Sequence, residues 1–366
     1  MSVKWAQNTF RYLFNSINLP NTVKRTQLQA YLRSKKLDLA LFCDPDPVLQ
    51  YLSEEALSHG LVAVTKTNTY VFSTALDKPS FPKDIIARSY KKDWHTQFHK
   101  PKRIGINKQA LTLGQYQNFR KAFPKSTFID VSSGLRELRI SKTPTEIKHI
   151  TLACKVTADS FAALIKELPK RTLRTENDVA FFLEKYIRSH DCELAFPTIA
   201  AMGKNAAVPH HKTNNTRLTR GFLLLDYGAR YNNYCADMTR VLFLGRASPA
   251  EKKMYNLLLE SQQAGVDFAK PGVEFTAIDA HVREVLGKYK SAFIHSLGHG
   301  VGVEIHEDPF CRKGATVDEG TIFTVEPGVY FPGKYGLRIE DTLVMEKGKA
   351  RILTTAPKQL IEVSKF

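Results

Sequence analysis

The segment spanning residues 221–240 limits the possible folds of this chain most narrowly, because it predicts a β-hairpin with two acidic residues inside it. Asn232-Asn233 lies in the middle of the segment, and asparagine tolerates the left-handed backbone that a tight hairpin turn requires. With the turn centred on this pair, Asp237 lies opposite Gly228. Asp226, two residues before Gly228, points to the same face. Two carboxylates therefore meet on an otherwise apolar sheet.

Two carboxylates inside an apolar core need a positive partner, because desolvation and mutual repulsion penalise both anions. An arginine such as Arg240 could supply that charge, and so could a metal ion, and the hairpin alone leaves both alternatives open. A second acidic pair favours the metal ion. Glu326 and Glu340 flank the loop 332–336, and they share one face of the sheet if the connection has odd length.

Glycines and histidines are interleaved in the segment 294–306, which contains the run Gly298-His-Gly-Val-Gly302. Simple strand alternation would place His299 and His306 on opposite faces. Both side chains can reach one site only if the backbone is irregular around the three glycines. Glycine permits such a backbone and lets a ligand approach closely.

Taken together, these motifs resemble the pita-bread peptidases, the family of prolidase, aminopeptidase P, methionine aminopeptidase and creatinase. The resemblance covers essentially the whole chain. In that family the metal ligands are an Asp in Asp-x-Gly, an Asp before Ile/Met-Thr-Arg, a His in Gly-His-Gly, a Glu before Pro-Gly and a Glu within Arg-Ile-Glu-Asp. The residues at these positions here are Asp226, Asp237, His299, Glu326 and Glu340. Because none is missing, the resemblance implies a working metallopeptidase.

The resemblance also implies two divalent metal ions. Four carboxylates and one imidazole form a hard, oxygen-rich set of donors that suits Mn, Co, Fe or Zn better than copper. The family pattern assigns Asp226 to one ion and His299 with Glu326 to the other, while Asp237 and Glu340 bridge the two. A water molecule between the ions is then the expected nucleophile. Glu326 is expected to carry a proton to the leaving amine as a catalytic residue.

Three further residues receive roles from the resemblance alone. The segment 196–210 is similar to the one that carries the family's substrate-side histidine, so His210 is preferred over His211. His306 matches the second such histidine, in a His-Glu-x-Pro motif typical of the proline-directed branch. Both histidines are expected to be catalytic and to bind the substrate. Arg338, in the Arg-Ile-Glu-Asp motif, is expected to orient a ligand or bind the substrate.

The expected reaction is hydrolysis of the peptide bond preceding proline in short peptides, as in prolidase. In some prolidases an Arg follows the His-Glu-x-Pro motif and binds the carboxylate of a dipeptide, but Phe310 stands there in this chain and Arg312 is the nearest base. An Xaa-Pro aminopeptidase that acts on longer peptides therefore remains an alternative. A non-catalytic pita-bread binding module is a further alternative, which the complete ligand set disfavours.

The length of 366 residues and the apolar content of 43% predict two domains with buried cores. Helices and strands alternate over residues 1–135, which predicts a smaller α/β unit similar to the creatinase N-terminal domain. Residues 136–366 are expected to form the pita-bread catalytic domain, an α+β arrangement of helices and antiparallel hairpins. Thr143-Pro-Thr-Glu146 predicts the start of its first long helix. Thr175, Ser248 and Thr276 are the expected caps of three more.

Composition indicates where such a protein works and with what. The first ten residues contain no apolar segment of an export signal, and no later run could span a membrane. Five scattered cysteines predict no disulfide framework, so a cytoplasmic protein is expected. The net charge of +17 lies mainly before residue 140, in short runs without aromatic neighbours, and does not predict nucleic-acid binding. A homodimer is expected from the family resemblance alone.

Overall fold

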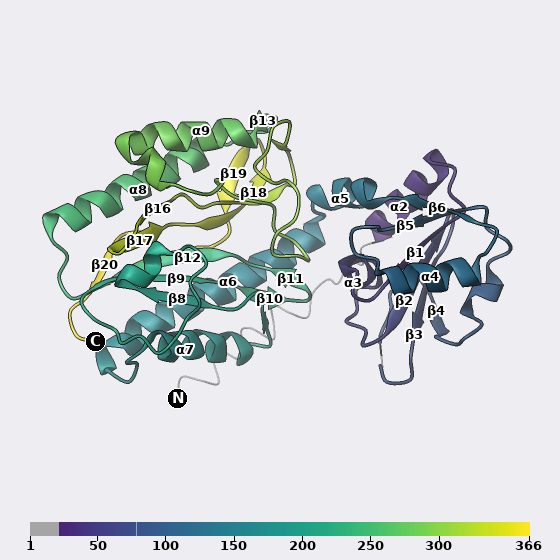
Figure 1. Cartoon of the computed structure of the whole chain (residues 1–366), viewed down its shortest axis with the longest axis horizontal. Coiled ribbons are helices and arrows are strands. Elements are labelled where there is room, and N and C mark those ends of the chain that lie inside the picture. The colour runs from purple at the N-terminus through teal and green to yellow at the C-terminus, as the bar shows by residue number, and fades with distance from the viewer. Residues whose placement is uncertain (1–21, 78) are drawn as a thin grey trace. The chain divides into compact units, whose positions relative to one another are not determined.

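The computed structural model describes residues 22–77 and 79–366. This part of the chain forms two compact units, one ending at Asp130 and the other spanning Val131–Phe366 (Figure 1). The expected boundary between residues 135 and 136 stays a prediction, and it falls inside the first helix of the second unit. The first ten residues, whose composition argued against an export signal, lie outside the described ranges.

The first unit is built on a mixed sheet with the strand order β4-β3-β2-β1-β5-β6. Strand β1 pairs antiparallel with β2 and parallel with β5, which joins the hairpin half of the sheet to the parallel half. The expected strands at residues 39–43 and 103–106 are confirmed. The elements of this unit are α2 (Thr22–Ser34), β1 (Leu39–Cys43), α3 (Pro47–Ser53), β2 (Gly60–Thr65), β3 (Thr69–Ser73), β4 (Ile85–Ser89), η1 (Trp94–Gln97), β5 (Arg103–Ile106), α4 (Leu113–Ala122) and β6 (Thr127–Asp130).

Both faces of this sheet are buried, and one of them carries an apolar cluster that includes α4. Alternate residues of β1, such as Leu39 and Leu41, point to that face because side chains alternate along a strand. Phe119 from α4 packs on the same core, and Trp94 lies edge to face with Phe119 at a centroid distance of 6.2 Å. Among the described residues of this unit, no group of His, Cys, Asp and Glu is arranged to hold a metal ion.

The second unit contains five α-helices in the described chain, and hydrogen-bonded caps start three of them. The side chains of Thr143, Thr175 and Ser248 each accept a hydrogen bond from the backbone amide three residues on. The acidic side chain of that later residue accepts one from the backbone amide of the cap residue. None of the helices in the described ranges is long and apolar enough to cross a membrane. The five are α5 (Ser132–Ile140), α6 (Pro144–Glu167), α7 (Glu176–Arg188), α8 (Pro249–Phe268) and α9 (Phe275–Leu286).

The prediction that Thr276 caps α9 is wrong. Pairing of β13 with β14 holds the chain extended up to Glu274, and the amide of Phe275 then donates to the carbonyl of Ala315. The helix therefore begins at Phe275, with Glu274 as an N-cap that makes no side-chain capping bond. The Thr276 hydroxyl donates to the Glu274 carboxylate instead.

The strands of the second unit form a curved, mainly antiparallel array between two pairs of helices. Helices α6 and α7 pack on the first hairpin and its neighbours, whereas α8 packs on α9 and on the later strands (Figure 1). The strands are β7 (Glu193–Leu194), β8 (Ile199–Met202), β9 (Gly221–Tyr227), β10 (Ala229–Tyr231), β11 (Tyr234–Cys235), β12 (Met238–Leu244), β13 (Val273–Glu274), β14 (Thr316–Val317), β15 (Ile322–Val325), β16 (Gly328–Phe331), β17 (Tyr335–Arg338), β18 (Asp341–Glu346), β19 (Lys349–Ile352) and β20 (Ile361–Val363).

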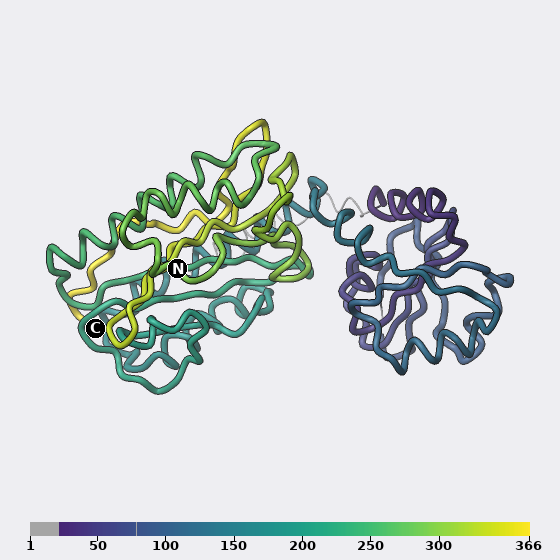
Figure 2. The backbone as a smooth tube through the Cα atoms, turned by 45° about the horizontal axis from the view of Figure 1, so that its top comes forward, coloured from purple at the N-terminus to yellow at the C-terminus, as the bar shows by residue number. Residues whose placement is uncertain are grey.

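Segments that are distant in sequence lie side by side in this array. The last strand, β20, pairs in parallel with β12, although α8 and α9 separate the two in the chain (Figure 2). A large apolar core fills the space between these strands and the helices α8 and α9, with Phe243, Phe275 and Phe323 fully buried in it. The α+β class expected for this unit is confirmed.

Candidate metal centre

The first acidic pair is placed by the hairpin that the sequence predicted. Asn232 and Asn233 both adopt the left-handed backbone, with φ of 45° and 71°. The register that starts at this turn continues through the pairing of β9 with β12, where Asp226 lies opposite Thr239. Asp237 is therefore opposite Gly228, as expected. Gly228 is required there, because a Cβ atom on it would lie 1.8 Å from the carbonyl oxygen of Ala236.

The second acidic pair follows from a single register shared by two strand pairs. Pairing of β16 with β17 and of β15 with β18 both place Glu326 opposite Glu340, at the break between them. The turn is shorter than the expected loop, because Tyr335 and Gly336 already belong to β17. It still has odd length, so the prediction that the two glutamates share one face holds.

The segment rich in glycine approaches other backbones very closely. A Cβ atom on Gly298 would lie 2.2 Å from the carbonyl oxygen of Thr324, and one on Gly300 would lie 2.4 Å from that of Asp308. Gly300 also bridges to both Glu307 and Phe323, so the chain leaves regular strand geometry here. This irregular backbone brings the rings of His299 and His306 to a centroid distance of 4.3 Å, as the sequence analysis required.

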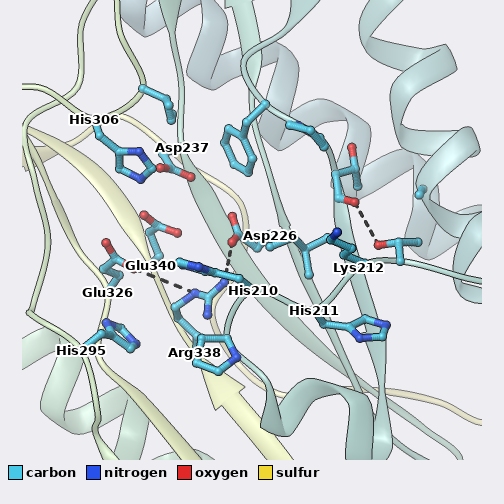
Figure 3. A pocket seen from close by; sticks show the side chains of 18 of the residues that line it. His210, His211, Lys212, Asp226, Asp237, His295, His306, Glu326, Arg338 and Glu340 are labelled. Atoms are coloured by element: carbon cyan, nitrogen blue, oxygen red, sulfur yellow. Dashed lines mark hydrogen bonds and ion pairs between the residues drawn. The ribbon is translucent and has the colours of Figure 1, made fainter.

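The five expected metal ligands line one cavity of about 870 Å³. Donor atoms of Asp237, His299 and Glu340 all lie within 4.8 Å of one another, and Nε2 of His299 lies 3.3 Å from Oε1 of Glu326. Asp226 enters from β9 and faces the same space (Figure 3). One carboxylate oxygen on each of three ligands has no hydrogen-bond partner although it is buried: Oδ1 of Asp226, Oδ1 of Asp237 and Oε1 of Glu340.

Electrostatics in the cavity disfavour several bare carboxylates at once. Burial and then the charges of Glu340 and Asp226 raise the pKa of Asp237 well above its ordinary value. Burial and the charge of Glu326 likewise raise the pKa of Glu340. Burial opposes ionisation of Glu326 too, but its hydrogen bond to His299 lowers its pKa overall. A cation between these groups would remove the penalty on the ionised forms.

Arg338 contacts two of the expected ligands, Asp226 directly and Glu340 through Thr239. Its Nη2 donates to Oδ2 of Asp226, its Nε donates to Oγ1 of Thr239 at 3.0 Å, and its Nη1 donates to the hydroxyl of Tyr330 at 2.7 Å. Thr239 in turn donates to Oε2 of Glu340 at 2.6 Å. With 3% of its surface exposed, Arg338 has the contacts of a ligand-orienting residue, and substrate binding by it stays a prediction.

Arg240 does not neutralise the first acidic pair. It donates to Oδ1 of Asp341 at 2.6 Å and to several backbone carbonyls, including those of Thr354 and Ala356. It therefore ties β12 to the C-terminal strands on the side away from the ligands. The arginine that pairs with Asp226 is Arg338. This ion pair still leaves Oδ1 of Asp226 and Oδ1 of Asp237 without partners.

Comparison with known proteins decides the family. The model described as metallopeptidase family M24 matches residues 148–347, and the creatinase/prolidase N-terminal domain matches residues 24–141. The chain belongs to metallopeptidase family M24. The Xaa-Pro dipeptidase of Pyrococcus horikoshii is 31% identical over 342 residues, which cover 90% of this chain and 96% of that protein. The Xaa-Pro dipeptidase of Lactobacillus helveticus is 31% identical over 371 residues, 91% of this chain and 97% of that protein.

Solved structures of similar proteins have the same fold. The Xaa-Pro dipeptidase from Bacillus anthracis has a TM-score of 0.85 at 28% identity and covers 94% of this chain and all of its own. The X-Pro aminopeptidase from Thermotoga maritima has a TM-score of 0.83 at 29% identity, covering 90% of this chain and all of its own. The predicted pita-bread catalytic domain with a creatinase-like N-terminal domain is therefore confirmed. The prediction that the protein is a metallopeptidase is confirmed as well.

Two histidines of this metallopeptidase lie in the cavity that the five expected ligands line. His210 is exposed and lines the cavity, where Figure 3 draws it next to Arg338. His306 lies against His299, and burial lowers its pKa to about 4. His211 points elsewhere and pairs through Nε2 with the buried carboxylate of Glu176 at 2.9 Å. The preference for His210 over His211 agrees with this geometry, and the catalytic roles of His210 and His306 stay predictions.

His295 and Tyr330 also belong to the site, although no motif in the sequence pointed to them. The Nδ1 of His295 faces the carbonyl of Ser296 at 2.9 Å, so it carries the proton, and Nε2 accepts from the Tyr330 hydroxyl at 2.9 Å. That hydroxyl accepts from Arg338, which makes a chain of hydrogen bonds along the cavity wall. Strand alternation could have predicted Tyr330, because it lies four residues after Glu326 and therefore points to the same face.

The donors present in this metallopeptidase fit a divalent ion. Three buried carboxylate oxygens lack partners, and two of the residues that carry them, Asp237 and Glu340, have donor atoms within 4.8 Å of one another and of the His299 imidazole. Oxygen-rich sites of this composition suit Mn, Co, Fe or Zn. Thr239 donates a hydrogen bond to Glu340, and Arg338 donates one to Asp226. Hydrogen bonds of this kind, which orient the expected ligands, are typical of metal sites. The ordered acidic cluster is therefore explained by a cation rather than by an internal ion pair.

Proposed function

We propose that this protein is an Xaa-Pro dipeptidase, which hydrolyses the peptide bond preceding proline in short peptides. The observation that carries the proposal is the convergence of Asp226, Asp237, His299, Glu326 and Glu340 with buried carboxylate oxygens that lack partners. The relatives that match almost the full chain are Xaa-Pro dipeptidases, which supports the proline preference. The His-Glu-x-Pro motif that carries His306 supports the same branch of the family.

We assign two divalent ions to the cavity. Asp226 would hold one ion, His299 and Glu326 would hold the other, and Asp237 and Glu340 would bridge them. Bound there, such ions supply Lewis acidity and make a water molecule acidic enough to attack a peptide carbonyl at neutral pH. Manganese, cobalt, iron or zinc would each suit the donors.

The side chains of the chain itself perform the remaining steps. Glu326 accepts a proton from the attacking water and delivers it to the leaving proline nitrogen, for which its lowered pKa keeps it ionised at the start. His210 and His306 flank the cavity and bind the substrate, donating hydrogen bonds to the oxyanion that develops on the attacked carbonyl. Arg338 and Thr239 keep the carboxylates in place while charge moves between them.

A second candidate is an Xaa-Pro aminopeptidase that acts on longer peptides. Phe310, 38% exposed at the cavity, stands where some prolidases carry an arginine for the dipeptide carboxylate. The cavity volume of about 870 Å³ is in the range of sites that hold drug-sized ligands, which are larger than a dipeptide.

A homodimer that works in the cytoplasm and binds no nucleic acid completes the proposal, and its assembly can be checked by light scattering.

Hydrolysis of Ala-Pro, Ala-Pro-Ala and Ala-Ala by the manganese- or cobalt-loaded protein tests this proposal. The account expects cleavage of both proline peptides and little cleavage of Ala-Ala. A preference for Ala-Pro over Ala-Pro-Ala below about a thousandfold, or some 4 kcal/mol, is expected because no arginine stands at position 310. Cleavage of Ala-Ala with no gain from proline would contradict the proposed specificity.

A further inference from the structure

A dipeptide presents a carboxylate one residue beyond the bond that is cut, and several acidic residues line this cavity. Asp226, Asp237, Glu326 and Glu340 line the cavity, as does Glu184 from α7. The two ions proposed above would balance the four ligand carboxylates, so the carboxylate of the substrate needs a cation of its own. The structure therefore has to provide a cation near the site if dipeptides are to bind well.

The lining of the cavity offers few cations for this role. Its lysine and arginine residues within the described chain are Lys212 and Arg338. All three nitrogens of the buried Arg338 guanidinium already donate to side chains of the site. Arg312, the nearest base to Phe310, does not line this cavity. It pairs with Asp308 at 2.8 Å and lines a separate cavity beside α5.

Lys212 differs from these arginines because its ammonium group is free. Its side chain is exposed, and within the described part of the chain it makes no ion pair or hydrogen bond. Glu184, which lines the same cavity, forms no ion pair with it. A lysine in this position can turn its charge into the cavity without breaking an existing contact.

The backbone that carries Lys212 is held firmly on both sides. Nε2 of His211 donates to the buried carboxylate of Glu176 at 2.9 Å, and the amide of Asn214 donates to the same carboxylate at 3.3 Å. The Thr213 hydroxyl accepts from the amide of Ala200 at 2.8 Å and donates to the carbonyl of Thr198 at 3.0 Å. These bonds fix where the flexible side chain starts, which lowers the entropy cost of binding through it.

The same bonds place Lys212 one strand away from a metal ligand. Thr213 is bonded to β8, and Ile199 of β8 lies directly opposite Asp226 of β9. Neighbouring strands are about 4.8 Å apart, so roughly two such spacings separate the chain at Thr213 from Asp226, with β8 between them. A residue of the substrate spans at most about 3.6 Å of chain, and the long side chain of a lysine reaches towards it. A carboxylate one residue beyond a carbonyl at the ligands therefore falls within reach of a lysine there. Figure 3 draws Lys212 on the His211 side of Asp226, with Glu326 and His295 on the other side of Asp226 in that view.

We propose that Lys212 is a specificity-determining residue that binds the C-terminal carboxylate of the dipeptide substrate. This inference rests on the proposed Xaa-Pro dipeptidase function and adds the group that recognises the end of the substrate. A lysine forms a single mobile ion pair, whereas an arginine binds a carboxylate through two parallel hydrogen bonds. The preference for dipeptides therefore exists but stays moderate, and salt weakens it because the pair is exposed to solvent.

The test compares Ala-Pro with its amide, Ala-Pro-NH2, which lacks the carboxylate. Each protein is assayed on both peptides, so damage that affects all substrates alike cancels in the ratio of the two kcat/KM values. The wild-type protein is expected to favour Ala-Pro about tenfold, and Lys212→Gln is expected to remove most of that preference through a higher KM for Ala-Pro. Lys212→Arg should keep it.

Lys204→Gln is the matched control, because Lys204 is exposed in the nearby η3 helix (Gly203–Ala207) and does not line the cavity. It should leave the ratio unchanged. An unchanged ratio in Lys212→Gln would overturn the role of Lys212 while leaving the dipeptidase function intact. A wild-type protein that cleaves neither proline peptide would instead refute the proposed function on which the inference rests.

Discussion

Side chains in the cavity divide into those that would hold a cation and those that would touch the peptide. Asp237, His299 and Glu340 are buried and mutually close, and one carboxylate oxygen each of Asp237 and Glu340 lacks a partner, which is typical of ligands. His210 is exposed at the cavity and lies outside this group. Substitutions at the two kinds of residue should therefore have different effects on bound metal.

The first prediction compares Asp237→Asn with His210→Ala. Asp237→Asn removes a charge that both ions would share, so bound metal should fall substantially and activity with it. His210→Ala should retain its metal and lose roughly a hundredfold in kcat, the usual effect of one proton-transfer or oxyanion group. Metal analysis by mass spectrometry, together with kinetics, checks both. Loss of metal from His210→Ala would mean that His210 is itself a ligand.

At the scale of elements, strand alternation explains why much of the site could be predicted. Asp226 and Asp237 share one face of their hairpin, and Glu326 lies opposite Glu340 in theirs, because each arrangement is set by a turn whose residues and parity are visible in the sequence. The path of residues 298–302 could not be derived, because it depends on carbonyls of Thr324 and Asp308, which are distant in the chain. The start of α9 was misplaced for a similar reason, since the β13–β14 pairing determines it.

The second prediction concerns this irregular segment. Gly300→Ala forces a Cβ atom to within 2.4 Å of the Asp308 carbonyl oxygen, where backbone must move. The free energy of unfolding should fall by about 2 kcal/mol or more, and displacement of His299 should weaken metal binding. Urea unfolding and metal titration measure the two effects. Gly114→Ala is the control, because nothing lies within 4 Å of the new atom in α4 and a gain of about 0.5–1 kcal/mol is expected. Equal stability of Gly300→Ala and the wild type would contradict the close approach.

At the scale of the whole molecule, the acidic cluster couples metal binding to pH. Burial and neighbouring charges raise the pKa values of Asp237 and Glu340 above those of the unfolded chain. Acids shifted in this direction stabilise the metal-free fold below their unfolded pKa values, near 4, and that stability is lost as pH rises through the folded values. The metal-free protein should therefore become less stable as the solution is made less acidic, and bound ions should reverse this.

The third prediction follows from the same coupling. Binding of manganese or cobalt in mildly acidic solution should release protons, because the ions displace them from Asp237 and Glu340. Calorimetric titrations in two buffers of different ionisation enthalpy measure the number released. Glu340→Gln should release fewer protons than the wild type. Metal binding without any proton release would show that the carboxylates are already ionised in the metal-free protein.

The most direct measurement of the central claim is hydrolysis of Ala-Pro by the purified protein before and after removal of metal. We expect the cluster of Asp226, Asp237, His299, Glu326 and Glu340 to support hydrolysis only with cations bound. Dialysis against a chelator should abolish hydrolysis, and added manganese or cobalt should restore it, with about two ions bound per chain at full activity. Undiminished hydrolysis of Ala-Pro by thoroughly metal-free protein would contradict the account.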